Sequence, residues 1–254
     1  MRNLLLSSVK PTLAICIMGL ALSLAACNEQ ETAMAEQTFG PKPTLGEPEK
    51  SLLPTVNVAK AIGWPQGAKP TAAQGMAVNA FATGLDHPRT VYVLPNGDVL
   101  VAETNAPSRP DEEKGVMGWI TKMVMSRAGA VTVSANRITL LRDANGDGIA
   151  ETRSTFLEGL NSPFGMALVG NDFYVANSDA ILKFPYRTGD TKITASGVKL
   201  VDLPAGPLNH HWTKDLVASP DGSKLYATVG SNSNIGENGM EAEEIGRASG
   251  RERV

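Results

Sequence analysis

Three segments of the chain share one pattern of apolar and polar positions: an apolar run, a short polar turn and a second apolar run. They are Thr90–Glu103, Phe164–Asn177 and Leu216–Gly230. In each segment, β-branched or aromatic residues flank a turn built from Asn, Asp and Gly, which adopt the backbone angles of tight turns at little cost. The pattern predicts a β-hairpin in each segment.

The predicted hairpins recur at a nearly regular interval. Their turns centre on Gly97, Asn171 and Asp221, and leaving out residues 107–130 makes both intervals about 50 residues long. This period suits a β-propeller blade, which has four short strands, so we expect an all-β propeller domain at residues 76–243 with about three blades. Further strands are predicted at 138–142, 153–157, 181–184 and 199–203, and an outer strand at 78–82 would close the ring with a later blade.

Residues 107–130 interrupt the repeat with a segment of different periodicity. Its centre has the sequence GVMGWITKMVMSRAGA, in which Met117, Ile120, Met123 and Val124 recur at helical spacing. We expect an amphipathic helix that packs on the propeller through these side chains. A contact with a membrane or a partner through the Met-rich face is the alternative.

Residues 1–27 have the pattern of an export signal. Arg2 and Lys10 precede an apolar stretch at 13–26 that is short for a membrane span. The stretch ends in Leu-Ala-Ala-Cys27, which resembles the lipobox of bacterial lipoproteins, so we expect Cys27 to become the lipid-bearing N-terminus. An ordinary signal peptide with an incidental cysteine is the alternative.

The residues after Cys27 extend this interpretation. In lipoproteins of Gram-negative bacteria, a residue such as Asn28 at the next position directs the protein to the outer membrane, which implies a lipid-anchored protein at the periplasmic face of the cell envelope. Residues 28–75 are rich in proline and are expected to form a tether. Because Cys16 lies in the signal and Cys27 would carry lipid, no thiol remains for a disulfide.

The end of the chain departs from the preceding pattern. Residues 244–254, EIGRASGRERV, resemble a translated sequencing adapter, and we exclude them from the fold as a non-native tail; a native basic surface tail is the alternative. A foreign tail would mean that the native protein continues beyond Glu243. The chain has a formal net charge of −3, and an acidic protein is not expected to bind nucleic acid.

Polar residues collect at one end of the predicted hairpins. The residues before the first strand and after the second strand lie opposite the turn, because the two strands are antiparallel. Polar loops around a propeller channel are typical of a ligand site, although loops are also commonly polar without one. The residues concerned are Asp86, His87, Arg89, Glu103, Asn105, Asn161, Ser162, Asn177, Asn209, His210, His211, Ser231, Asn232 and Asn234.

His210 and His211 stand out in this set. The chain has only three histidines, and two of them are adjacent just before a predicted strand. An imidazole can accept a proton from an alcohol near neutral pH, which makes the pair a candidate base. A structural pair that hydrogen-bonds the loop backbone is the alternative.

Four stretches carry a resemblance to a known family. They are GLDHPRTVYVLPNGDVLVAET, KGVMGWITKMVMSRAGA, LLRDANGDGIAETRSTFLEGLNSPFGMAL and NHHWTKDLVASPDGSKLYATVGSN. From about Phe81 to Glu243, the chain resembles the sorbosone dehydrogenase branch of the soluble glucose dehydrogenase-like propellers. The resemblance implies a six-bladed propeller, of which this C-terminally truncated chain would be roughly the first half.

The resemblance also implies a chemistry. The family oxidises a sugar or sugar aldehyde by hydride transfer to pyrroloquinoline quinone (PQQ), which bound Ca²⁺ polarises, and an electron acceptor that the sequence does not identify would take the electrons onward. His211 is then the expected general base, and His210, Asn232 and Asn161 are expected to contact the quinone. Glucose-specific relatives carry an acidic residue at the position of His210. Most cationic quinone ligands and the catalytic calcium are expected in later blades, so this chain alone is expected to be inactive.

A second candidate metal site lies between two predicted strands. Asp143, Asn145 and Asp147, followed by Gly148, match the start of a calcium-binding loop. The twelfth position holds Ser154, where the helix–loop–helix pattern has Glu. An ion here would be structural, and a plain Asp/Asn/Gly turn is the alternative.

Two other classes of function remain open. A calcium-dependent propeller lactonase or other hydrolase would hold its ion through residues such as Glu103, Asn161 and Asn177. A non-catalytic ligand-binding propeller lipoprotein would use the same face without a base.

Overall fold

The computed structural model describes residues 41, 58–108, 115–130, 132–205, 209–230 and 251–253. The chain divides into two units, Met1–Val56 and Asn57–Val254, and all the elements named below lie in the second. None of the helices that the structure describes has both the length and the apolar character needed to cross a membrane.

The first sheet contains the first predicted hairpin and two further strands. Its strands are antiparallel neighbours in chain order, which is the meander of a propeller blade. They are β1 (Pro88–Val93), β2 (Val99–Glu103), β3 (Arg137–Arg142) and β4 (Thr152–Leu157).

The second sheet repeats this topology, and the third sheet contains the last predicted hairpin. The second consists of β5 (Met166–Val169), β6 (Asp172–Ala176), β7 (Ala180–Pro185) and β8 (Val198–Asp202). The third consists of β9 (Leu216–Ala218), β10 (Leu225–Thr228) and β11 (Arg251–Arg253). All three predicted hairpins and the four additional strands are therefore confirmed. Because β11 lies in the segment that we expect to be non-native, the origin of that segment stays a prediction.

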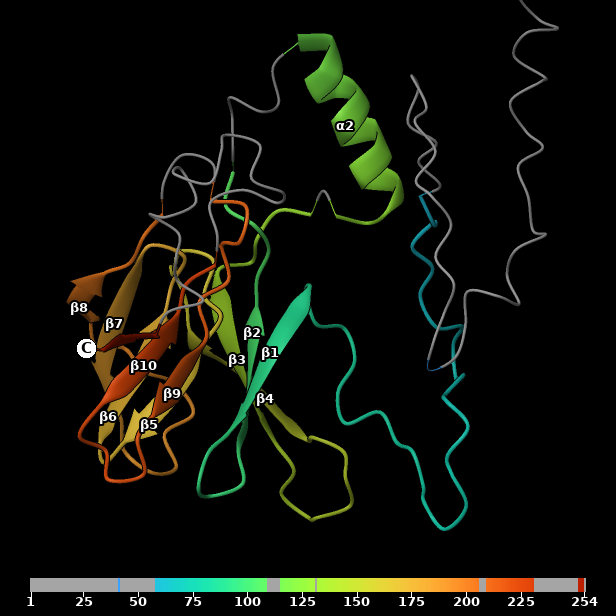
Figure 1. The fold of residues 1–254 in the computed structure, drawn as a ribbon. Helices are drawn as coiled ribbons and strands as arrows, with labels where there is room; N and C mark the ends of the chain where they lie inside the picture. The colour runs from blue at the N-terminus through green and yellow to red at the C-terminus, as the bar shows by residue number, and fades with distance from the viewer. Residues whose placement is uncertain are drawn as a thin grey trace, which may run out of the picture. The chain divides into compact units, whose positions relative to one another are not determined.

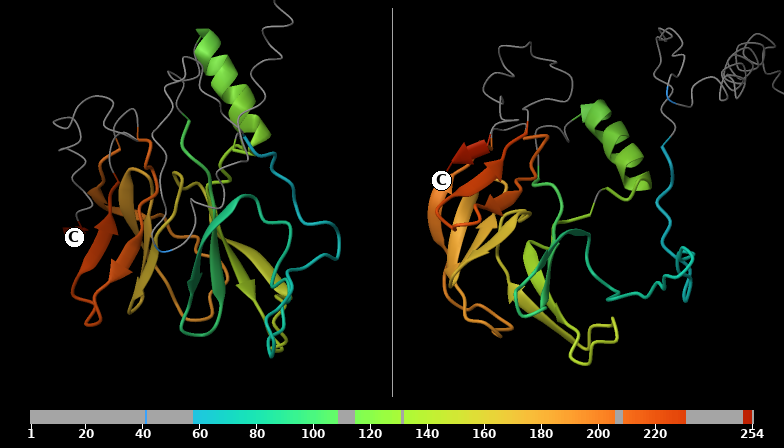
Figure 2. Two further views of the ribbon diagram at one scale, coloured as in Figure 1. Left: turned by 45° about the vertical axis from the view of Figure 1, so that its right-hand side comes forward. Right: turned by 60° about the horizontal axis from the view of Figure 1, so that its bottom comes forward.

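The three sheets lie side by side in chain order (Figures 1 and 2). Tyr92 on β1 accepts a hydrogen bond at its hydroxyl from the Leu168 amide on β5, at 3.0 Å. The Gly165 amide donates to the Lys214 carbonyl, at 3.0 Å, and so connects the segments that lead into β5 and β9. The first strands of successive sheets are thus neighbours. The described chain is all-β apart from one helix, with sheets arranged like adjacent propeller blades.

Two apolar cores hold the sheets together. The larger core includes Phe156 on β4 and Phe173 on β6, whose rings meet edge to face with centroids 5.4 Å apart. The smaller core includes Ile181, Leu216 and Leu225 and lies between the second and third sheets. The inner strands β2 and β3 are buried almost throughout, so they are nearly continuous apolar runs that the sequence pattern could locate.

One expectation about local structure stays a prediction and one is wrong. The strand expected at 78–82 would pair with a later blade, and without that partner these residues form no strand; the Phe81 carbonyl accepts a hydrogen bond from the Ala150 amide in the loop between β3 and β4. Helix α2 (Gly115–Arg127) forms inside the predicted segment, but Ile120 and Met123 are exposed rather than packed on the sheets. Helical periodicity shows which side chains share a face, but it does not show what covers that face.

The sheets have two distinct ends. The hairpin turns β1–β2, β5–β6 and β9–β10 point in the same direction, downward in Figure 1, and the loop between β3 and β4 lies at this end too. The opposite end, called the loop end below, carries the segments that lead into β1, β3, β5 and β9 and those that follow β2 and β6. Helix α2 belongs to the connection between β2 and β3 and therefore extends from the loop end.

A candidate ligand-binding face at the loop end

Strained backbone conformations gather at the loop end. Among the described residues, four non-glycine residues have positive φ: His87 at 52°, Asn136 at 51°, Ser162 at 45° and Asn209 at 31°. They precede β1, β3, β5 and β9, so all four lie at the same end of the sheets. Left-handed backbone is costly for residues with a side chain and tends to cluster at functional sites. This clustering marks the loop end as the candidate functional face.

Asn136 joins the first two sheets at this end. Its Oδ1 accepts hydrogen bonds from the Ser162 amide at 2.9 Å and from the Ser134 hydroxyl at 2.6 Å. The Ser134 hydroxyl in turn accepts a hydrogen bond from the Asn105 amide, at 3.0 Å. The strained positions at Asn136 and Ser162 are therefore stabilised by one shared side chain.

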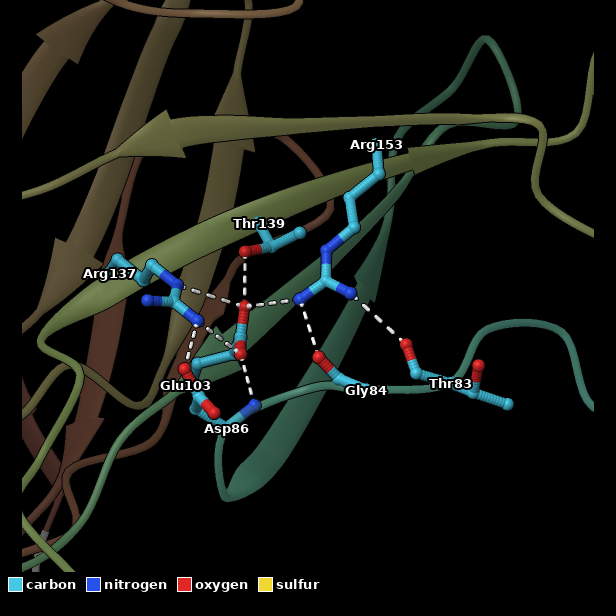
Figure 3. Close-up of polar contacts among 7 residues, drawn as sticks. All are labelled: Thr83, Gly84, Asp86, Glu103, Arg137, Thr139 and Arg153. Atoms are coloured by element: carbon cyan, nitrogen blue, oxygen red, sulfur yellow. Dashed lines mark hydrogen bonds and ion pairs between the residues drawn. The ribbon is translucent and has the colours of Figure 1, made fainter. Parts of the chain in front are cut away.

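Glu103, at the end of β2, is the centre of a buried ionic cluster (Figure 3). Its carboxylate is fully buried and accepts hydrogen bonds from Arg137, with Nη2 at 2.8 Å, from the Thr139 hydroxyl and from the Asp86 amide. Arg137 also pairs with the Asp86 carboxylate, at 2.6 Å. Arg153 lies 3.8 Å from Glu103 and donates to the carbonyls of the segment before β1.

The cluster keeps Glu103 ionised. Burial raises the pKa of the Glu103 carboxyl, but the hydrogen bonds from Arg137, Thr139 and the Asp86 amide outweigh it and hold that pKa below its ordinary value. Hydrogen bonds to the carboxylates of Glu103 and Asp86 raise the pKa of Arg137. Because the oxygens of Glu103 are already engaged, the structure gives no support to Glu103 as an ion ligand of a lactonase-type site.

The segment that carries His210 and His211 is held from inside by Lys214. Lys214 is buried, and its Nζ donates to the His211 carbonyl at 3.1 Å and approaches Asn209 Oδ1 at 3.4 Å. Burial lowers the pKa of Lys214, and no carboxylate of the described residues offsets this effect. A buried ammonium whose partners are neutral oxygens is costly.

Two glycines make close contact with the same segment. A Cβ on Gly230, which follows β10, would overlap the Cβ of His211. A Cβ on Gly165, just before β5, would overlap the backbone around Lys214 and Leu216. The backbone of His211 is therefore fixed on several sides, whereas its imidazole is exposed.

Three aromatic and cationic side chains meet beside His211. Trp212 is buried, with the Arg89 guanidinium 5.4 Å from its ring centroid and the Phe164 ring edge-on at 6.5 Å. Arg89 lies at the start of β1, and Phe164 and Trp212 precede β5 and β9. Side chains from all three sheets therefore converge, and the exposed Arg89 adds a positive charge.

Asn177, after β6, carries an acceptor without a donor among the described residues. The side chain is buried, and its Oδ1 has no hydrogen-bond partner in this part of the chain. Such an oxygen is rarely left alone in a folded protein, so it is a candidate contact for a ligand or ion. Asn161 is exposed, and its carbonyl accepts a hydrogen bond from the Ser178 amide at 3.0 Å.

The sequence located some of these residues and missed others. His210, His211, Asn161 and Asn177 lie at the loop end as expected, whereas Asn232, Ser231 and Asn234 lie outside the described residues. Sequence patterns gave no signal for Lys214 or Asn136, because their roles depend on burial and on contacts with other sheets. The Leu-Asp-His87 and Leu-Asn-Ser162 triplets before β1 and β5 could have indicated two of the four strained positions.

The candidate calcium loop lies at the other end of the sheets, between β3 and β4. Asp143 accepts hydrogen bonds from the Gly148 and Gly146 amides at 2.8 and 2.6 Å, and these bonds lower the pKa of its carboxyl, the Gly148 bond most. One oxygen from each of Asp143, Asp147 and Glu151 lies within 4.8 Å of the others. Glu151 was missed, although it stands at the ninth position of the motif. The Asn145 Oδ1 contact with the Asp147 amide also occurs in plain Asx turns, so calcium binding here stays a prediction.

Comparisons with known proteins give a distant structural likeness. No curated protein matches the chain. The holo form of the PQQ domain of pyranose dehydrogenase from Coprinopsis cinerea is 19% identical over 71% of this chain, with a TM-score of 0.47. The calcium structure of a Trichoderma reesei enzyme of carbohydrate-active family AA12 is 16% identical over 68% of this chain, with a TM-score of 0.46. The chain spans 37% of the length of each of these structures.

A family model also matches the chain. The model described as a domain of unknown function, DUF7133, matches residues 110–253. That range covers more than half of the chain and includes the helix, the second sheet and the His210–His211 segment. The sorbosone branch stays a prediction. The chain belongs to the DUF7133 family.

Proposed function

We propose that this protein oxidises a sugar or a sugar aldehyde by hydride transfer to PQQ, with His211 as the general base. One observation carries the proposal: His211 is exposed, and Lys214 holds its backbone from inside, at the end of the sheets where the strained residues gather. A base must be held in place to accept a proton from a bound hydroxyl group. Rigid backbone with an accessible imidazole meets that requirement.

The residues at the loop end fit part of a quinone site. PQQ, when bound, supplies the two-electron acceptor for the hydride, and its carboxylates require cations or hydrogen-bond donors. Arg89 offers an exposed guanidinium beside Trp212, and the Asn177 Oδ1 offers an acceptor for a hydroxyl group or for Ca²⁺. His210, Asn161 and Asn232 remain proposed quinone contacts.

Several related proposals concern the whole protein. We propose that residues 1–27 are a lipoprotein signal, that Cys27 carries lipid and that 28–75 tether the domain to the periplasmic face of the outer membrane. The native protein would continue beyond Glu243 to a six-bladed propeller, so that this chain alone does not turn over substrate. A structural Ca²⁺ would be held by Asp143, Asn145 and Asp147, with Glu151 as a further ligand.

A reconstitution assay tests the proposed activity. The exported protein, with the native sequence that follows Glu243, is mixed with PQQ, Ca²⁺, an artificial electron-accepting dye and a panel of aldoses and sugar aldehydes. We expect dye reduction only when both quinone and sugar are present. Opening of an added lactone without quinone would instead assign a hydrolase. Sugar binding without either reaction would assign a binding protein.

A further inference from the structure

Helix α2 presents an apolar stripe to solvent. Val116, Trp119, Ile120 and Met123 are spaced i, i+3, i+4 and i+7, so they share one face of the helix. Their side chains are 74, 64, 38 and 53% exposed. Exposed apolar side chains that are adjacent on one helix face are candidates for a contact with another protein or with a membrane.

Two further exposed apolar residues follow a contact between the tether and the end of α2. The Ala61 amide donates a hydrogen bond to the Arg127 carbonyl at the end of α2, at 3.2 Å, and the Ala61 side chain lies against Gly129. Ile62 and Trp64 follow directly and are 84 and 71% exposed. We call the set Ile62, Trp64, Val116, Trp119, Ile120 and Met123 the apolar surface.

The charged residues of α2 and of residues 58–80 are all basic, although the whole chain is acidic. Residues 58–80 contain Lys60 and Lys69 and no acidic residue, and α2 contains Lys122 and Arg127 and no acidic residue. Asp111, Glu112 and Glu113 precede α2 but lie outside the described residues. Apolar side chains that include tryptophan, bordered by lysine and arginine, are typical of surfaces that enter the headgroup region of anionic membranes.

We propose that the apolar surface lies against a lipid membrane that contains anionic headgroups. Helix α2 has 13 residues, too few to span a bilayer, so it would lie in the interfacial plane. The proposal draws on the proposed lipid anchor in one respect: the chain that leads from Cys27 reaches the helix at Ala61, so the anchor and the apolar surface would engage the same membrane. A single acyl signal binds a membrane only weakly, and a second contact makes the attachment stable.

The placement of α2 gives this contact a consequence for the candidate site. The helix belongs to the β2–β3 connection, which emerges from the loop end. Docking through α2 would turn the loop end toward the membrane.

Tryptophan fluorescence provides a direct test, because the three tryptophans differ in environment. Trp64 and Trp119 belong to the apolar surface, whereas Trp212 is buried in the domain. The exported protein is mixed with vesicles of phosphatidylcholine and phosphatidylglycerol that carry bromine atoms near the headgroups. We expect bromine to quench the emission of Trp64 and Trp119 but not that of Trp212, as assigned with the single variants Trp64→Phe, Trp119→Phe and Trp212→Phe.

Matched variants distinguish membrane binding through the apolar surface from non-specific adsorption to vesicles. A double variant with Trp119→Ser and Met123→Ser should reduce quenching of Trp64 by about tenfold. Vesicles of phosphatidylcholine alone, which lack the anionic headgroups, should also quench the wild type much more weakly. The control pair Val93→Thr and Val217→Thr changes exposed apolar residues on β1 and β9 and should leave quenching as in the wild type.

The outcomes distinguish this proposal from the others. The membrane proposal would be overturned if anionic vesicles did not quench Trp119. It would also be overturned if light scattering detected a dimer in which self-association covers Trp119. Mass analysis of the N-terminal peptide reports lipid on Cys27 independently, so a missing anchor is distinguishable from a missing membrane contact. The dye assay reports the oxidation separately.

Discussion

At the residue scale, the loop end shows two ways of burying a charge. Glu103 is buried with Arg137, Thr139 and the Asp86 amide, so its charge is compensated by several donors. Lys214 is buried with only neutral oxygens as partners among the described residues. The first arrangement stabilises the first sheet, whereas the second fixes the turn that carries His211 at a cost in stability.

Substitution of Glu103 should have an effect that depends on pH. The folded-state pKa of Glu103 is lowered, so its contribution to stability is present above the ordinary pKa of a glutamate and is lost as pH falls through the folded value. We expect Glu103→Gln to lower the free energy of unfolding by about 3 kcal/mol at pH 7, because it leaves Arg137 without its main partner. The loss should shrink below about pH 4.

Urea unfolding of wild type and variant at both pH values checks this expectation. The matched control is Glu158→Gln, which removes an exposed carboxylate paired with Lys192 and should cost less than about 1 kcal/mol. An equal loss at pH 7 and at low pH for Glu103→Gln would show that the charge of Glu103 is not what stabilises the sheet.

At the element scale, the strands were predictable from sequence and the surroundings of the helix were not. The apolar run of residues 99–103 and the Asn-Gly turn at Gly97 are both local features of the sequence. The spacing in α2 correctly predicted a helix, but whether Met123 is covered depends on distant parts of the chain. Residues 78–82 have strand-like composition, but a strand also needs a partner.

The contact between the second and third sheets gives a prediction for a single glycine. An added Cβ at Gly165 would overlap the backbone of Lys214 and Leu216, so Gly165→Ala should force the two sheets apart. We expect a loss of about 1–3 kcal/mol in the free energy of unfolding. Gly63→Ala is the control, because nothing lies within 4 Å of a Cβ there, and its effect should stay within about 0.5 kcal/mol.

Thermal or urea unfolding of both glycine variants measures the difference. If Gly165→Ala were as stable as Gly63→Ala, the close approach of the segments before β5 and β9 would not be present in solution.

At the scale of the whole molecule, the repeat of similar sheets along the chain explains how much of the candidate site the sequence could predict. Equivalent loops of successive sheets must fall at one end, so the placement of His210, His211 and Asn161 followed from the repeat alone. The contacts that organise this face run between sheets, as from Asn136 to Ser162 or from Arg89 to Trp212. No local pattern encodes such contacts, which is why they became visible only in three dimensions.

The two proposals concern the same end of the molecule. The loop end carries the candidate base, and α2 extends from that end with its apolar stripe exposed. Oxidation at the loop end and docking through α2 would place the reacting centre next to the membrane. Each proposal has its own readout, so one can fail without the other.

The most direct test of the central claim is the rate of dye reduction by His211→Ala. The variant is made in the exported protein with its native sequence after Glu243, and the rate is measured with PQQ, Ca²⁺ and sugar. Loss of a positioned base should lower turnover by about a hundredfold or more, whereas Lys224→Ala, at the turn end of the same hairpin, should retain wild-type turnover. Unchanged turnover in His211→Ala would contradict the account.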